Sequence, residues 1–217
     1  LIGALPHCAA RRPVGRRPLA ACVSPQRRGG ACARASVRWA EPSQQTMPSI
    51  WNLKQLLRGL AGQEQLLLFC DLHGHSRKRN IFVYGCEGTK GFAKYRERVF
   101  PKLLADCQHF SPASCSYKVL RSKESTGRVV VWRQFALAHS FTLEASLCGP
   151  DYGPLQGAHF NTLHLQEMGA AFVPALCELI DPAQTRVNAI TAELEASLPS
   201  NGAGGSDGDD DAAEAGA

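Results

Sequence analysis

The chain has 217 residues, of which 44% are hydrophobic and 20% are charged, which is enough apolar material for one core. No apolar run approaches the roughly 20 residues of a membrane-spanning helix, so the sequence predicts no membrane partner. The net charge of +5 comes largely from residues 1–40, which hold eight arginines and no acid. Because the middle of the chain is nearly balanced, we expect no nucleic-acid partner.

Residues 1–37 are rich in Arg, Ala, Pro and Gly and show no apolar period, so we expect them to be disordered. An arginine-rich, acid-free start can be an organelle-targeting peptide. The start at Leu1 and the missing amphipathic pattern favour a truncated or artefactual start instead. The nine cysteines form no CxxC pair and follow no secretory apolar region, which predicts reduced thiols in a cytoplasmic protein.

Helices and strands alternate along the rest of the chain, a pattern typical of an α/β domain. In chain order we expect helix 49–62, strand 65–72, strand 80–86, helix 91–107 interrupted by Pro101, strand 115–122, a β-branched, strand-like run at 128–132, strand 139–149 and helix 161–180. Residues 183–217 form a polar and acidic low-complexity tail, which we expect to be solvated.

The stretch FCDLHGHSRKRN, residues 69–80, places two histidines and an aspartate just past a buried strand. We expect His73 and His75 to face opposite ways, so that only one of them points at a metal, and we predict that this one is His73. Asp71, on the same side as His73, would either fix the orientation of the imidazole ring or simply end the strand. A plain loop histidine is the alternative, and a metal site needs further ligands.

Glu144 stands at the centre of the apolar strand 139–149. A carboxylate there is costly to bury unless it is paired or functional, and a carboxylate beside a metal-bound water is the usual general base. Exposure at a sheet edge is the alternative. Arg121, Lys123 and Arg128 flank the preceding loop, where a fixed guanidinium would suit an acidic ligand if the loop lines a pocket.

A second histidine–glutamate pair, His164 and Glu167, has the HxxE spacing that can hold zinc on one helical face. We interpret this pair as surface residues rather than ligands, because the helix has another apolar face. The residues that we expect to be buried there are Leu163, Leu165, Met168 and Phe172.

The motifs FCDLHGHSRKRNIFVYGC, SKESTGRVVVWR and SFTLEASLCG, in this order and spacing, resemble the cytosolic carboxypeptidases. That branch of the zinc metallocarboxypeptidases trims C-terminal glutamates, notably from tubulin. The resemblance covers residues 38–182. It implies a mixed, mainly parallel sheet with helices on both faces, one Zn2+ ion, and acidic protein tails as partners. By position, His73 would be a zinc ligand, Glu144 the catalytic base and Arg128 the contact for a glutamate side chain.

Two motifs of that family do not occur before residue 38: the HxxE that carries the first two zinc ligands, and an Asn-Tyr-Arg-like motif that grips the substrate's terminal carboxylate. The resemblance therefore implies the C-terminal half of a catalytic domain, incomplete at its N-terminal side and inactive as given. The alternative is a non-catalytic half-domain or pseudoenzyme that binds acidic tails. A third hypothesis is a nucleic-acid binder that uses the basic arm.

Overall fold

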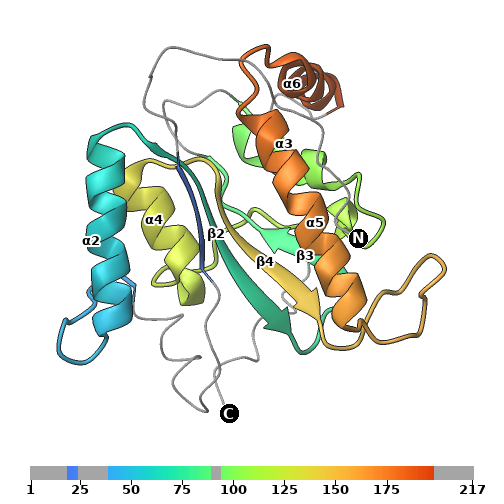
Figure 1. Cartoon of the computed structure of the whole chain (residues 1–217), viewed down its shortest axis with the longest axis horizontal. Helices are drawn as coiled ribbons and strands as arrows, with labels where there is room; N and C mark the ends of the chain where they lie inside the picture. The colour runs from blue at the N-terminus through green and yellow to red at the C-terminus, as the bar shows by residue number, and fades with distance from the viewer. Residues whose placement is uncertain (1–18, 24–38, 89–93, 198–217) are drawn as a thin grey trace, which may run out of the picture.

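The computed structural model describes residues 19–23, 39–88 and 94–197. Within these ranges the strands form one mixed sheet in the order β1-β2-β4-β3 (Figure 1). Strand β4 pairs in parallel with β2 and antiparallel with β3, while β1 pairs in parallel with β2. The strands are β1 (Leu19–Val23), β2 (Leu66–His75), β3 (Ile81–Tyr84) and β4 (Ser140–Ser146). The mixed, mainly parallel arrangement agrees with the predicted α/β class.

Helices cover both faces of the sheet (Figure 1). One face carries α2 (Pro48–Gly62) and α4 (Gly127–Phe135). The other carries α3 (Arg96–Leu104) and α5 (Thr162–Leu179), with α6 (Thr185–Ser197) packed beside them. In the part of the chain that is described, none of the helices combines the length and apolarity needed to cross a bilayer.

Successive side chains of each strand point to opposite faces of the sheet, and this divides the core into two clusters. The larger cluster lies under α3 and α5 and contains Leu68 and Cys70 of β2 together with Phe141 and Leu143 of β4. The smaller cluster lies under α2 and α4, where Phe69 meets Trp39 and other apolar side chains. This smaller cluster ends at Phe69, so the carboxyl-terminal halves of β2 and β4 present other residues on that face.

Most predicted elements are confirmed with shifted ends. Helices 49–62 and 161–180 are observed as α2 and α5, and the strands predicted at 65–72, 80–86 and 139–149 as β2, β3 and β4. The helix predicted at 91–107 is the shorter α3, with Pro101 inside it. Residues 91–93 lie outside the described residues.

Two segments that we expected to lack structure each contain an element. Strand β1 falls within residues 1–37, where its uncharged LAACV run pairs through the backbone with β2; the rest of that segment lies outside the described residues. Helix α6 falls within the predicted tail, because Ile190 and Leu194 lie one turn apart and are buried in the larger cluster. The low-complexity interpretation was therefore wrong for residues 185–197.

Two predicted strands are also wrong. Residues 128–132 belong to α4, where Val129, Val130 and Val131 are buried against the sheet, so tertiary packing overrides their β propensity. Residues 115–122, all of which are described, contribute one isolated bridge between Ser116 and Tyr84 before a 3-10 turn begins at Arg121.

His139, which immediately precedes β4, should make the fold sensitive to acid. It is 3% exposed, and burial, with a smaller effect of Arg96, lowers its pKa from 6.5 to about 3. Between these two values the unfolded chain binds more protons than the folded chain, so stability falls as the pH falls below 6.5. We expect His139 alone to lower the free energy of unfolding by about 2 kcal/mol between pH 7 and pH 5.

Urea unfolding at pH 7, 6 and 5 measures this loss. In the His139→Gln variant, which carries no titrating group at this position, the free energy of unfolding should depend less on pH. An identical pH dependence in both proteins would contradict the assignment.

Candidate functional site

The polar residues of β2 and β4 lie opposite one another where these parallel strands end. The paired positions are Asp71 with Thr142, His73 with Glu144, and His75 with Ser146. Residues directly opposite each other project from the same face of a sheet, and here that face is the one covered by α2 and α4. Ligands of α/β sheets commonly bind beyond the carboxyl ends of the strands, so this edge is the candidate site.

His73 is oriented by a carboxylate from its own strand. Its Nδ1 lies 3.0 Å from Oδ1 of Asp71, whose side chain is 8% exposed, while the His73 side chain is 23% exposed. Because the Asp71 carboxylate lies within ion-pair distance of Nδ1, Nε2 is the nitrogen that can bind a metal. The structure thus supports the orienting role for Asp71. It places His73 inside β2 rather than in a loop.

The expectation that His73 and His75 face opposite ways is wrong, because both belong to β2 and strand residues two apart share a face. Their surroundings distinguish them instead. His75 is 7% exposed, and its Nδ1 accepts the backbone N–H groups of Arg77 and Lys78 at 3.2 and 2.9 Å. His75 therefore anchors the turn after β2. The choice of His73 as the metal-facing residue remains a prediction, now on different grounds.

Glu144 occupies the middle of this group. It is 9% exposed on β4, between its partners His73 on β2 and Phe82 on β3. Exposure at a sheet edge, the alternative explanation for this carboxylate, is wrong because β4 is an interior strand. A buried carboxylate opposite a carboxylate-oriented histidine is suited to exchange a proton with a molecule bound between them.

Arg128 reaches the same face from α4 and is 5% exposed. Its Nε donates to the Gly85 carbonyl at 3.3 Å, and its guanidinium lies 5.2 Å from the ring centroid of Tyr84. Tyr84 pairs with Thr142, which precedes Glu144 by two positions on β4. Burial raises the pKa of neighbouring Cys86 to about 11 against the opposing charge of Arg128, so this cysteine is a thiol and not a nucleophile.

A further cation at this face was missed in the sequence. The Lys78 ammonium donates to the Ser114 carbonyl at 2.7 Å and lies 4.6 Å from the ring centroid of Phe82 and 5.9 Å from that of Tyr84. Lys78 belongs to the basic run SRKRN, which directly follows the two histidines, and this run was the feature of the sequence that could have indicated it. The cations considered in the sequence, Arg121 and Lys123, lie in the 3-10 turn before α4.

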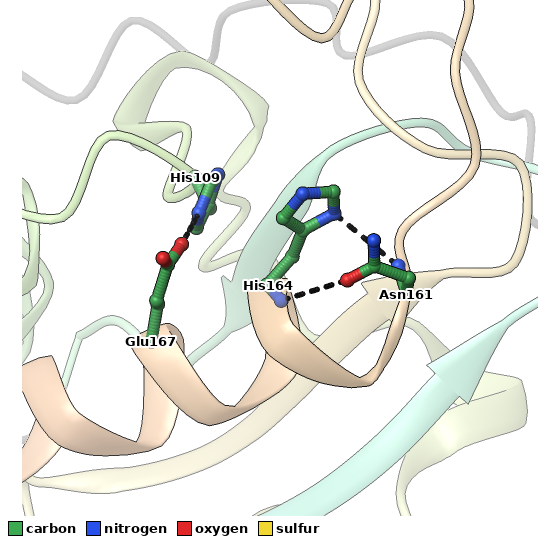
Figure 2. A network of polar contacts seen from close by, with 4 residues as sticks. All are labelled: His109, Asn161, His164 and Glu167. Carbon is green, nitrogen blue, oxygen red and sulfur yellow. Dashed lines mark hydrogen bonds and ion pairs between the residues drawn. The ribbon is translucent and has the colours of Figure 1, made fainter.

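The HxxE pair makes two separate contacts (Figure 2). Nδ1 of His164 accepts the backbone N–H of Asn161 at 3.2 Å, and the Asn161 side chain accepts the His164 N–H at 3.1 Å, which caps α5. Glu167 instead meets Nε2 of His109 at 2.5 Å. Each side chain thus has a structural role at the start of α5.

The buried face predicted for α5 is partly wrong. Met168 is buried, but Leu163 and Leu165 are 58% and 46% exposed. The helix packs on the core mainly through Met168, Ala175 and Leu179, so the leucines of its first turn contribute little to the core.

The zinc predicted for this chain requires more ligands than the site holds. Among the described residues, no group of three or more His, Cys, Asp or Glu side chains could hold a metal ion. His73, oriented by Asp71, fits one ligand position of a catalytic zinc, which normally has three protein ligands. The described residues therefore fit a part of a zinc site and not a whole one.

Sequence comparison relates this chain to known proteins, although no protein-family model matches it. The chain is 41% identical to bovine (Bos taurus) cytosolic carboxypeptidase 3 over 155 residues, or 70% of its length. It is 39% identical to human (Homo sapiens) cytosolic carboxypeptidase 1 over 182 residues, or 76% of its length. The chain is homologous to the cytosolic carboxypeptidases. It spans 15% and 14% of these two relatives.

Solved structures agree with this homology at the level of the fold. A metallo-carboxypeptidase from Pseudomonas aeruginosa matches 68% of this chain with a TM-score of 0.57 and 22% identity, and one from Burkholderia cenocepacia matches 72% with a TM-score of 0.55 and 17% identity. The matches cover 39% and 38% of those chains. The resemblance to cytosolic carboxypeptidases is confirmed, and the fold corresponds to part of the metallo-carboxypeptidase fold.

Proposed function

We propose that this chain provides a zinc-binding histidine, the general base and the specificity cation of a zinc carboxypeptidase that removes C-terminal glutamates from proteins such as tubulin. The observation that carries this proposal is the pairing of His73 with Glu144 at the carboxyl ends of two parallel strands, beside the buried Arg128. We further propose that residues 38–182 form the unit that carries these groups, and that the protein acts in the cytoplasm, as the names of its homologues suggest.

Each residue has a defined task in this proposal. His73 would bind the metal through Nε2, with its ring held by Asp71. Zinc, when bound, would lower the pKa of a water molecule and polarise a carbonyl. Glu144 would accept a proton from water and pass it to the leaving amine, the exchange that a positioned carboxylate performs as general base and then general acid. Hydrolysis of the terminal peptide bond follows from these two roles.

Arg128 would select for glutamate. It is buried with its guanidinium over Tyr84 of β3, the strand next to the one that carries Glu144, and an arginine fork suits a carboxylate. In a chimera that takes the rest of its catalytic domain from bovine cytosolic carboxypeptidase 3, we expect Arg128→Ala to lower kcat/KM for peptides ending in glutamate by about tenfold to a hundredfold, the value of a charge-assisted hydrogen bond, with little change for peptides ending in alanine. The matched control Arg121→Ala removes a cation from the neighbouring 3-10 turn. An unchanged preference for glutamate in Arg128→Ala would assign selection to another cation.

A non-catalytic function is the second candidate, and a specific observation favours it: Lys78 and Arg128 lie over the rings of β3, next to the strand that carries Glu144. In that case the cations on this face bind acidic tails without cleavage. The two functions differ in what they predict for Glu144, because binding of an acidic tail does not need a buried carboxylate on the same face.

A chimera separates the two candidates. The matched segment of bovine cytosolic carboxypeptidase 3 would be replaced by the corresponding residues of this chain, so that the remaining ligands come from the relative. The proposal predicts about one zinc per chimera and release of glutamate from a peptide with a polyglutamate end. The 217-residue chain alone should release none. A folded chimera that binds the peptide but releases no glutamate would support the non-catalytic function.

A further inference from the structure

Two cations flank the aromatic pair on β3, although the proposed function uses only one of them. Lys78 lies beside Phe82 and Arg128 lies over Tyr84, with ring-centroid distances of 4.6 and 5.2 Å. The strand order places these rings next to Glu144, on the side away from His73. A peptide bound across Glu144 would therefore meet the metal-facing histidine on one side and both cations on the other.

Lys78 is held in place at both ends. Its backbone N–H donates to Nδ1 of the buried His75 at 2.9 Å, which fixes the turn. Its ammonium donates to the Ser114 carbonyl at 2.7 Å and lies over the rings of Phe82 and Tyr84. An ammonium has three donors, so one bond to Ser114 leaves capacity for a carboxylate. The residue is exposed, and a ligand can therefore reach it.

The two cations are spaced along the strand. The Lys78 ammonium lies nearer to the ring of Phe82 than to that of Tyr84. Arg128 lies over Tyr84 and donates to the Gly85 carbonyl. The ring centroids of Phe82 and Tyr84 lie 5.2 Å apart, and the two residues are separated along β3 by two positions, a backbone rise of roughly 7 Å. Alternate side chains of an extended peptide lie on one side at about the same spacing.

We propose that Lys78 binds a second acidic side chain of the substrate, two residues before the terminal glutamate that Arg128 binds. This inference rests on the proposed function for the position of the peptide. It gives the site a preference for tails with several acidic residues over tails that merely end in one.

Direct binding to the full 217-residue chain tests this inference. The probes are two dye-labelled peptides, Ala-Glu-Ala-Glu and Ala-Ala-Ala-Glu, with fluorescence anisotropy as the readout at low ionic strength. The chain should bind the first peptide about threefold to tenfold more tightly, the range expected for one partly exposed charge pair. Lys78→Met, which keeps the aliphatic stem, should remove this difference, and Lys78→Arg should retain it.

Arg79→Met is the matched control, because it removes the same charge from the next position of the turn. It should weaken both peptides by the same factor and leave the difference between them intact. The inference is overturned if the unchanged chain does not distinguish the peptides, or if Lys78→Met and Arg79→Met have equal effects on the difference.

This test is separate from that of the proposed function. Peptide binding needs neither hydrolysis nor Glu144. If the 217-residue chain shows the Lys78-dependent preference but the chimera releases no glutamate, the peptidase function is refuted and the role of Lys78 in binding is retained. Glutamate release without such a preference would refute the inference alone.

Discussion

Glu144→Gln in the chimera should lower kcat for glutamate release by about a hundredfold to ten-thousandfold, the usual contribution of a positioned general base. Glutamine preserves the size of a side chain that is 9% exposed on an interior strand, so the fold should be retained. Glutamine cannot accept a proton from water, so the chemical step is lost. Single-turnover kinetics measure the change, and metal analysis should still find about one zinc.

The control for this prediction is Glu167→Gln. Glu167 belongs to the HxxE pair and contacts His109 at the start of α5. We expect this variant to keep both its zinc and its activity. If Glu144→Gln loses zinc together with activity, Glu144 acts as a ligand or a structural residue and the role of base is wrong.

His73→Ala should reduce the zinc content of the chimera from about one ion to close to none. A catalytic zinc site normally has three protein ligands, and the loss of one leaves two. We expect Nε2 of His73 to face the metal, because the Asp71 carboxylate lies 3.0 Å from Nδ1. Metal analysis after dialysis against a weak chelator measures the loss.

His75→Gln is the matched control, since His75 lies two residues away on the same face of β2. Its Nδ1 accepts two backbone N–H groups of the following turn, so this change should lower stability and leave zinc bound. Retention of zinc by His73→Ala together with its loss from His75→Gln would reverse the assignment.

Local patterns were sufficient to predict the elements that form the centre of this site. The run around Phe69 predicted β2, and the apolar residues around Glu144 predicted β4. The sequence could not show that β4 lies between β2 and β3, because strand order depends on pairing between distant segments. Without this order, the opposition of His73 and Glu144 and the burial of the carboxylate could not be known.

The other features that the sequence did not show have the same origin. The valines of 129–131 favour a strand locally, yet they are buried in a helix because α4 packs on the sheet. Glu167 meets His109, which lies 58 positions earlier in the chain. Lys78 was hidden for a similar reason, since its position depends on Ser114 and on the rings of β3. Contacts of this kind follow from tertiary structure and leave no local pattern.

A crystal structure of the chimera, with an anomalous difference map recorded at the zinc absorption edge, shows directly whether His73 binds zinc. We expect one strong peak about 2.0–2.1 Å from Nε2 of His73, the usual zinc–nitrogen distance, with the Glu144 carboxylate facing it and not bonded to it. The proposed roles of His73 and Glu144 are wrong if the peak is bonded to His75, lies between His109 and His164, or is bonded directly to Glu144.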